Sequence, residues 1–210
     1  MPERFPYQAV AFLGSFLTFC LELAAAKLLL PRFGGSAYVW TACVMFFQGL
    51  LLAGYLWGHA ALRLCGTRRY SRIHLVLLLA PFFFFPLSLA PTPARLGALS
   101  ALLWLLVRAV GVPFFVLSTT LLVIQDRLMR ASDGERRDTY FLYAASNLGA
   151  LAALNAYPLV IEPCLPLAVQ SWSWAIGYIV FAILCGATAL VSTRAPQAAA
   201  APAAAPGAAN

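Results

Sequence analysis

Residues 8–30 read QAVAFLGSFLTFCLELAAAKLLL, and this single run is long enough to set the class of the fold. A helix rises about 1.5 Å per residue, so about 20 mostly apolar residues cross the hydrocarbon core of a bilayer. Five further runs of similar character follow along the chain. The predicted membrane-spanning helices cover approximately 8–30, 37–62, 73–90, 97–124, 139–161 and 167–192.

The composition of the whole chain agrees with this prediction. Of 210 residues, 62% are hydrophobic and 10% are charged, whereas soluble domains carry about 25% charged residues. There is too little polar surface to cover a water-soluble globule. We therefore expect an all-α, polytopic membrane protein in which residues 1–194 form one six-helix transmembrane bundle embedded in the lipid bilayer.

The charge distribution predicts the orientation of this bundle. The net charge is +7, but the arginines gather in two segments, 63–72 and 125–138, rather than on a basic face, so we expect no nucleic-acid partner. Because arginine-rich loops stay in the cytoplasm, both segments and both termini of this inner-membrane protein are predicted to be cytoplasmic. The arginines concerned are Arg63, Arg68, Arg69, Arg72, Arg127, Arg130, Arg136 and Arg137.

The two ends of the chain allow other interpretations. Residues 8–30 would be a signal peptide if Ala24-Ala25-Ala26 were a cleavage site, but the apolar run is long and Glu22 and Lys27 would flank the cut. After Arg194 the chain contains little besides Ala, Pro and Gly. With no large apolar side chain to bury, residues 195–210 are predicted to form a disordered, linker-like tail.

Small residues recur every four positions in two of the predicted spans. Gly54 and Gly58 form one pair, and Ala145, Gly149 and Ala153 form a longer series. Such spacing lets helix backbones approach each other closely in a membrane. It indicates close packing and no particular chemistry.

Polar groups inside the predicted spans are the candidate functional residues, because they are costly in a bilayer. Glu22 shares a helix stripe with Ser15 and Thr18, which would turn it toward a neighbouring helix. Glu22 and Arg108 fall at matched depths, about 5 Å outward of the bilayer centre, so an ion pair between them is possible. The candidate intramembrane polar site comprises Glu22, Lys27, Gln48, Arg108, Asn147, Asn155 and Glu162.

Two interpretations of this polar set remain open. It could be a structural hydrogen-bond network that holds the bundle together, or a polar cavity, open outward, that binds a cation or carries protons. His59 and His74 have no Cys or carboxylate partner at metal-ligand spacing, and no G-x-G, GxSxG, HExxH or P-loop occurs. We therefore expect no cofactor, no metal and no catalytic residue.

Two stretches carry a resemblance to a known family. The first is ELAAAKLLLPRFGGSAYVWT, residues 22–41, and the second begins with YAASNLGA, residues 143–150. The second continues through Tyr157-Pro158, Glu162-Pro163 and Gln170-Ser171-Trp172. Both resemble the membrane domain of bacterial membrane-bound spermidine synthase-like proteins, in which a transporter-like membrane part is fused to an aminopropyltransferase-like domain.

The resemblance implies a membrane module that handles or transports a small, cationic substrate and is non-catalytic alone, because the sequence contains no glycine-rich nucleoside loop of an aminopropyltransferase. It also implies a separate aminopropyltransferase-like protein, or a homo-oligomer, as partner. The main alternative is a structural or partner-binding membrane subunit, in which Glu22 would be packed against Arg108. A third is a membrane-embedded enzyme that uses Glu22 as acid or base.

Overall fold

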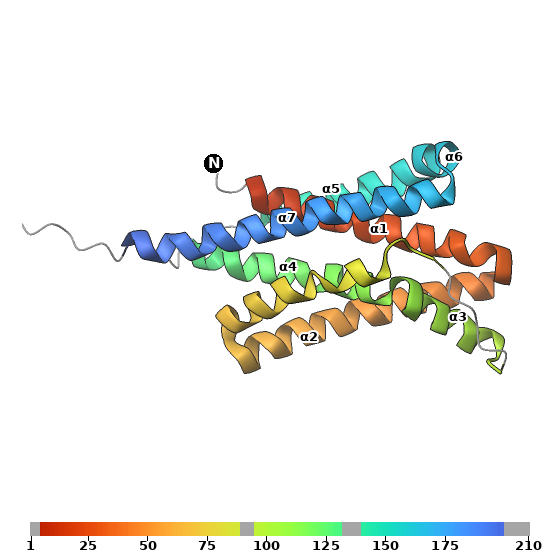
Figure 1. The fold of residues 1–210 in the computed structure, drawn as a ribbon, viewed down its shortest axis with the longest axis horizontal. Helices are drawn as coiled ribbons and strands as arrows, with labels where there is room; N and C mark the ends of the chain where they lie inside the picture. The colour runs from red at the N-terminus through yellow and green to blue at the C-terminus, as the bar shows by residue number, and fades with distance from the viewer. Residues whose placement is uncertain (1–4, 89–94, 132–139, 200–210) are drawn as a thin grey trace, which may run out of the picture.

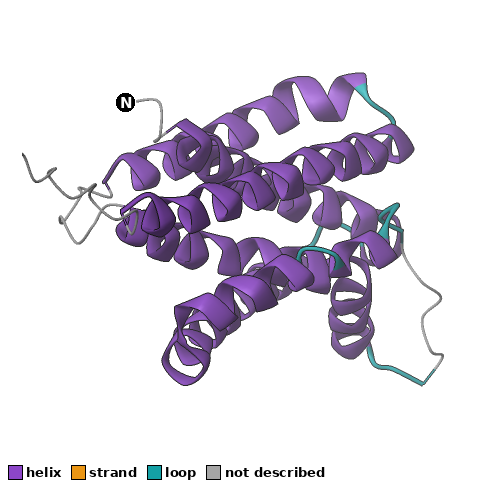
Figure 2. Cartoon of the chain, turned by 60° about the vertical axis from the view of Figure 1, so that its left-hand side comes forward, coloured by secondary structure: helices purple, strands orange, loops and turns teal. Residues whose placement is uncertain are grey.

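The computed structural model describes residues 5–88, 95–131 and 140–199, and these are helical with no strand (Figure 2). The long helices lie side by side and form one bundle (Figure 1). In chain order the elements are α1 (Phe5–Phe33), α2 (Ala37–Leu77), η2 (Ala80–Phe84), α3 (Ala98–Leu106), η3 (Val107–Gly111), α4 (Val112–Ala131), α5 (Tyr140–Ala156), η4 (Tyr157–Ile161), α6 (Glu162–Cys164) and α7 (Leu167–Ala199).

Within the described residues, five helical segments are long and apolar enough to cross a membrane, where the sequence predicted six spans. They are Phe5–Phe33, Ala37–Phe84, Ala98–Leu128, Tyr140–Cys164 and Leu167–Ala189. The difference arises in the second segment, which joins the predicted spans 37–62 and 73–90. Helical structure continues through residues 63–72, the arginine-rich stretch that was expected to be a loop.

Gly66 interrupts this 48-residue segment. Its φ of 69° and ψ of 162° are not helical, and such a positive φ is freely accessible only to glycine. The ribbon of α2 turns back on itself at the end of the bundle away from α3 (Figure 1). The Tyr70 hydroxyl lies 3.0 Å from the Cβ position of Gly58, although a continuous helix would separate these residues by about 18 Å. Residues 37–65 and 67–84 are therefore two antiparallel arms.

Two five-residue π-helical turns interrupt the other helices. One is η3, just before Pro113, and the other is η4, which contains Pro158. Proline has no N–H to donate to the carbonyl four residues earlier, so the helix widens or bends near it. Pro113 is the second residue of α4, within the predicted span 97–124.

The core of the bundle is built around α1, which packs against α5 and α7, and around α4, which packs against α2. Gly149 of α5 sits directly on the backbone carbonyl of Phe12, so the two helix backbones touch. Gly54 and Gly58 of the first α2 arm leave room for the side chains of Ser118 and Leu122 of α4. The small-residue series in the sequence are thus contacts between helices of one chain.

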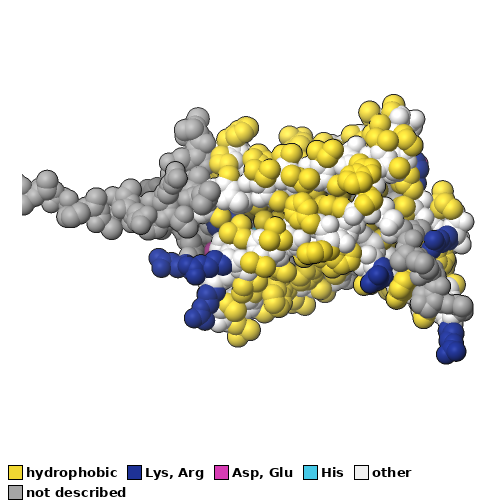
Figure 3. Space-filling model, in the orientation of Figure 1, with side chains coloured by type: hydrophobic (Ala, Val, Ile, Leu, Met, Phe, Trp, Pro, Cys, Tyr) yellow, Lys and Arg dark blue, Asp and Glu magenta, His cyan; other side chains and the backbone are white. Residues whose placement is uncertain are grey.

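The surface agrees with a membrane location. In the view of Figure 3, apolar side chains cover the middle of the face, and lysine and arginine side chains gather at its two ends. The start of α1, the reversal at Gly66 and the end of α7 lie at one end of the bundle (Figure 1). α7 runs to Ala199, five residues into the predicted tail. Residues 200–210 lie outside the described part of the chain.

Candidate functional site

A cavity of about 260 Å³ lies between α1, the first α2 arm and α4, with Ser146 of α5 and Phe181 of α7 also in its lining. Apolar and polar side chains both line it, and it is called the polar cavity here for its Glu, Gln, Ser and Thr residues. Glu22 and Gln48, two of the candidate residues, both line it. The cavity follows α1 from Val10 to Glu22 and reaches the surface beside the exposed side chains of Gln48 and Tyr55. Its other polar lining residues are Ser15, Thr18, Ser118, Thr120 and Ser146.

The wall of this cavity is rich in oxygen acceptors. The hydroxyls of Thr18 and Ser118 donate to the backbone carbonyls of Gly14 and Phe115, at 2.8 and 2.7 Å, so the lone pairs of these oxygens stay available. Among the described residues, the lining includes the Glu22 carboxylate but no Lys, Arg or His. A site with one carboxylate, several acceptors and no positive charge has the chemistry of a cation site.

Glu22 and Arg108 do not form the ion pair that their matched depths allowed. Arg108 is exposed, and its guanidinium lies 5.8 Å from the ring centroid of Trp104 on the same helix. Glu22 makes no ion pair or hydrogen bond among the described residues. Depth along two helices does not fix the faces they turn to each other, and Arg108 is not among the residues that line the cavity.

Lys27 and Glu162 form an ion pair instead, with 3.3 Å between Nζ and Oε1. The two side chains are 29% and 47% exposed, and they join the end of α1 to α6. An exposed pair of this kind contributes about 0–1 kcal/mol. These two residues therefore belong to the rim of the bundle and not to the cavity.

Asn147 and Asn155 also lie away from the cavity, both exposed on α5. The Asn155 amide donates to the carbonyl of Leu151 in its own helix, at 2.7 Å. Asn147 has no hydrogen-bond partner within the described chain. Of the seven candidate residues, the structure thus brings together Glu22 and Gln48 in one place and Lys27 and Glu162 in another.

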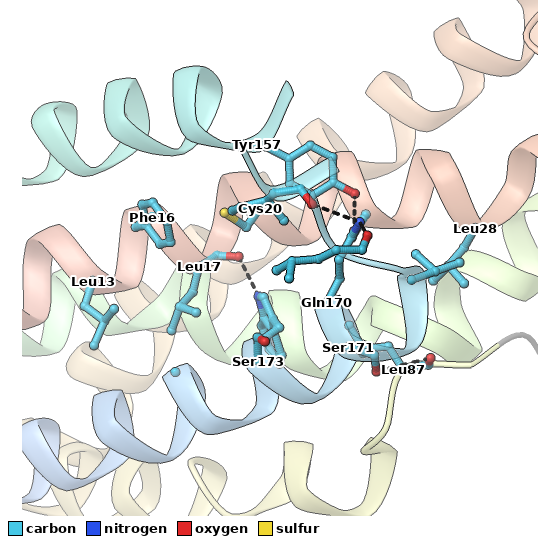
Figure 4. Close-up of a pocket in the computed structure, with 16 residues that line it drawn as sticks. Leu13, Phe16, Leu17, Cys20, Leu28, Leu87, Tyr157, Gln170, Ser171 and Ser173 are labelled. Atoms are coloured by element: carbon cyan, nitrogen blue, oxygen red, sulfur yellow. Dashed lines mark hydrogen bonds between the residues drawn. The ribbon is translucent and has the colours of Figure 1, made fainter. Parts of the chain in front are cut away.

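A second cavity, of about 160 Å³, lies between α1, η4 and α7 and is mostly apolar. Most of its polar side chains are already paired, as Figure 4 shows. The Tyr157 hydroxyl donates to Gln170 Oε1 at 2.9 Å, and Gln170 Nε2 donates to the Leu165 carbonyl at 2.8 Å. Trp174 Nε1 donates to the Leu17 carbonyl at 2.8 Å. Of the polar side chains in its lining, only Ser173 has no hydrogen bond among the described residues, and the cavity holds no charged group to recognise an ion.

Sequence reasoning missed the role of Arg127. It was expected in a cytoplasmic loop, but the structure places it in α4 with 2% exposure. Its Nε donates to Ser71 Oγ at 3.0 Å, and its Nη1 donates to the Cys185 carbonyl and to Thr188 Oγ1, at 2.9 and 3.1 Å. This Arg127 clasp ties α4 to the second α2 arm and to α7.

His74 is a second buried polar group that the sequence did not single out. It is fully buried, and its ring nitrogens lie 3.4 and 3.2 Å from the hydroxyls of Thr119 and Thr120. Thr120 also lines the polar cavity. His74 therefore helps to position Thr120, one of the residues of the cavity wall. No spacing motif in the sequence pairs His74 with a residue 46 positions away.

Comparisons with known proteins give no relatives to draw on. No protein-family profile, no curated protein and no solved structure matches the chain.

Proposed function

We propose that this chain is a membrane module that binds a small organic cation in the polar cavity, with the Glu22 carboxylate as the counter-charge. The observation that carries the proposal is the position of Glu22, on the wall of a polar cavity that has no basic side chain. A Glu22–Arg108 ion pair would have supported a purely structural role for both residues. The absence of that contact favours a ligand site.

The resemblance of residues 22–41 and 143–172 to the membrane part of spermidine synthase-like proteins supports the choice of cation. A polyamine is flexible, carries protonated amines and needs carboxylate and hydroxyl acceptors. We propose that the module handles or transports such a substrate in a bacterial inner membrane. It performs no aminopropyl transfer itself, and a separate aminopropyltransferase-like protein would supply or receive the cation.

We propose further that the chain crosses the membrane six times, with both termini in the cytoplasm. The segment Ala37–Phe84 has 48 residues, which as a straight helix would be about 72 Å long, more than twice the ~30 Å core of a bilayer. Two crossings joined at Gly66, one made by each arm, account for this extra length. The arginines at 63, 68, 69 and 72 then flank a cytoplasmic turn.

The topology is tested by cysteine labelling in intact cells with a membrane-impermeant maleimide, in a variant that lacks the native cysteines. A cysteine at Gly35 is expected to react from outside, and a cysteine at Arg69 is expected to react only after the membrane is opened. Both positions are exposed, so accessibility depends on the side of the membrane. Reaction of both from the same side would contradict the two crossings.

The cation site is tested by binding of spermidine to the purified protein in lipid nanodiscs, measured by calorimetry. Glu22→Gln is expected to weaken binding by about 10- to 100-fold, because it removes a charge-assisted hydrogen bond that contributes about 1.5–3 kcal/mol. Gln keeps the size of the side chain, so the cavity should keep its form.

Glu162→Gln is the matched control. It removes the same charge from the same membrane protein, but at the exposed pair with Lys27, and binding is expected to stay within about twofold of the unmodified protein. Equal affinities for the two variants, or no spermidine binding by the unmodified protein, would argue against the cation site and for a structural or partner-binding subunit.

A further inference from the structure

The outer face of α5 has no partner within the bundle. The small residues of this helix turn inward, with Gly149 on the Phe12 carbonyl and Ala153 fully buried. The opposite side carries exposed leucines, and the segment Tyr140–Cys164 is the least buried of the five apolar segments. The exposed leucines are Leu148, Leu151 and Leu154.

Two asparagines on this helix differ in how their amides are satisfied. Asn155 donates to the Leu151 carbonyl of its own helix at 2.7 Å, a bond that makes an amide tolerable in lipid. Asn147 is exposed and bonds to no described residue. It lies seven residues after Tyr140, about 10 Å into a segment about 37 Å long, so its amide falls within the hydrocarbon core.

We propose that α5 forms the interface of a homodimer in which Asn147 of one copy pairs with Asn147 of a second copy. An amide has both a donor and an acceptor, so two amides can exchange a pair of N–H···O bonds. Copies inserted in the same orientation are related by a two-fold axis along the membrane normal, which brings a residue opposite its counterpart at the same depth.

The spacing along α5 fits such an interface. Asn147, Leu151 and Leu154 follow at intervals of four and three residues, which is the spacing of a seam between two helices that cross at a shallow angle. This seam lies on the exposed side of α5, and Leu151 and Leu154 are 58% and 47% exposed. Closing it leaves the contact of α5 with α1 unchanged. The inference does not depend on the cation site.

The experiment measures energy transfer between donor- and acceptor-labelled copies in liposomes over a range of protein-to-lipid ratios. The unmodified protein is expected to dimerise. Asn147→Leu is expected to weaken the dimer by about 5- to 30-fold, the range for a pair of interhelical hydrogen bonds in a membrane. Asn147→Gln keeps an amide and is expected to retain most of the association.

Asn155→Leu is the matched control on the same helix. It makes the same chemical change eight residues further along α5, at an amide that is bonded within its own helix. The dimer affinity is therefore expected to stay unchanged. Neither side chain supports the bundle, so all the variants should unfold at the temperature of the unmodified protein. A monomer at every protein-to-lipid ratio, or equal dimer affinity for Asn147→Leu and the unmodified protein, would overturn the proposal.

Discussion

Gly149→Ala is expected to destabilise the bundle by about 3 kcal/mol, the upper part of the range for overpacking a tight contact. An added Cβ would overlap the backbone carbonyl of Phe12. Backbone atoms cannot rotate out of the way as a side chain can, so α1 and α5 would have to separate along their shared contact. The loss is measured as a shift in the unfolding midpoint of the detergent-solubilised protein.

Gly186→Ala is the control. It also replaces a helical glycine with alanine, but it is expected to change the stability in the opposite direction. Gly186 lies in α7, and nothing stands within 4 Å of its Cβ position. The substitution is expected to stabilise the protein by up to about 1 kcal/mol, because alanine loses less backbone entropy than glycine when a helix forms. If Gly149→Ala left the midpoint unchanged or raised it as Gly186→Ala does, the close approach of the α1 and α5 backbones would be contradicted.

Arg127→Met is expected to cost about 2–4 kcal/mol. The substitution removes the hydrogen bonds of a buried guanidinium to the second α2 arm and to α7, and it leaves the Ser71 hydroxyl without its donor. Bonds from a charged donor contribute about 1.5–3 kcal/mol each, and part of this is offset because a buried charge no longer has to be desolvated. The same unfolding measurement applies.

Arg72→Met tests whether the loss of stability comes from the buried hydrogen bonds of Arg127 or only from the loss of a positive charge. Arg72 is exposed on the second α2 arm, so this variant loses one positive charge from the same end of the bundle without losing a buried contact. It is expected to unfold within about 0.5 kcal/mol of the unmodified protein. Arg127→Lys should recover only part of the loss, because an ammonium group lacks the fork that reaches Ser71 and α7 together. Equal stability of Arg127→Met and Arg72→Met would rule out the clasp.

The membrane class and part of the site could be predicted from the sequence because they depend on one helix at a time. Apolar length marks a span without reference to its neighbours. The stripe that carries Ser15, Thr18 and Glu22 shows which face of α1 is polar, and these three residues line the cavity together. The turn near Gly66 falls within the segment expected to connect two spans, although helical structure on both sides leaves five apolar segments rather than six.

The rest depends on which helices are neighbours, and a single sequence does not contain that information. Lys27 and Glu162 pair across 135 positions, and Arg127 reaches Thr188 across 61. Arg127 stands in one of the two arginine-rich segments, so nothing in its local sequence distinguishes it from the exposed Arg68 or Arg69. The expected pairing of Glu22 with Arg108 failed for the same reason. The sequence gives the depth of each residue along its helix, but it does not give the direction around the helix axis that each side chain faces.

The reversal at Gly66 bears on how the protein is made. The contact between Tyr70 and Gly58 spans 12 positions, so the two arms can close on each other as soon as the second has left the ribosome, before α3 and α4 are synthesised. Short sequence separation makes such a closure fast. In the topology proposed above, the pair enters the bilayer as a hairpin whose arginine-bearing tip does not cross, and the later helices then pack against the two arms.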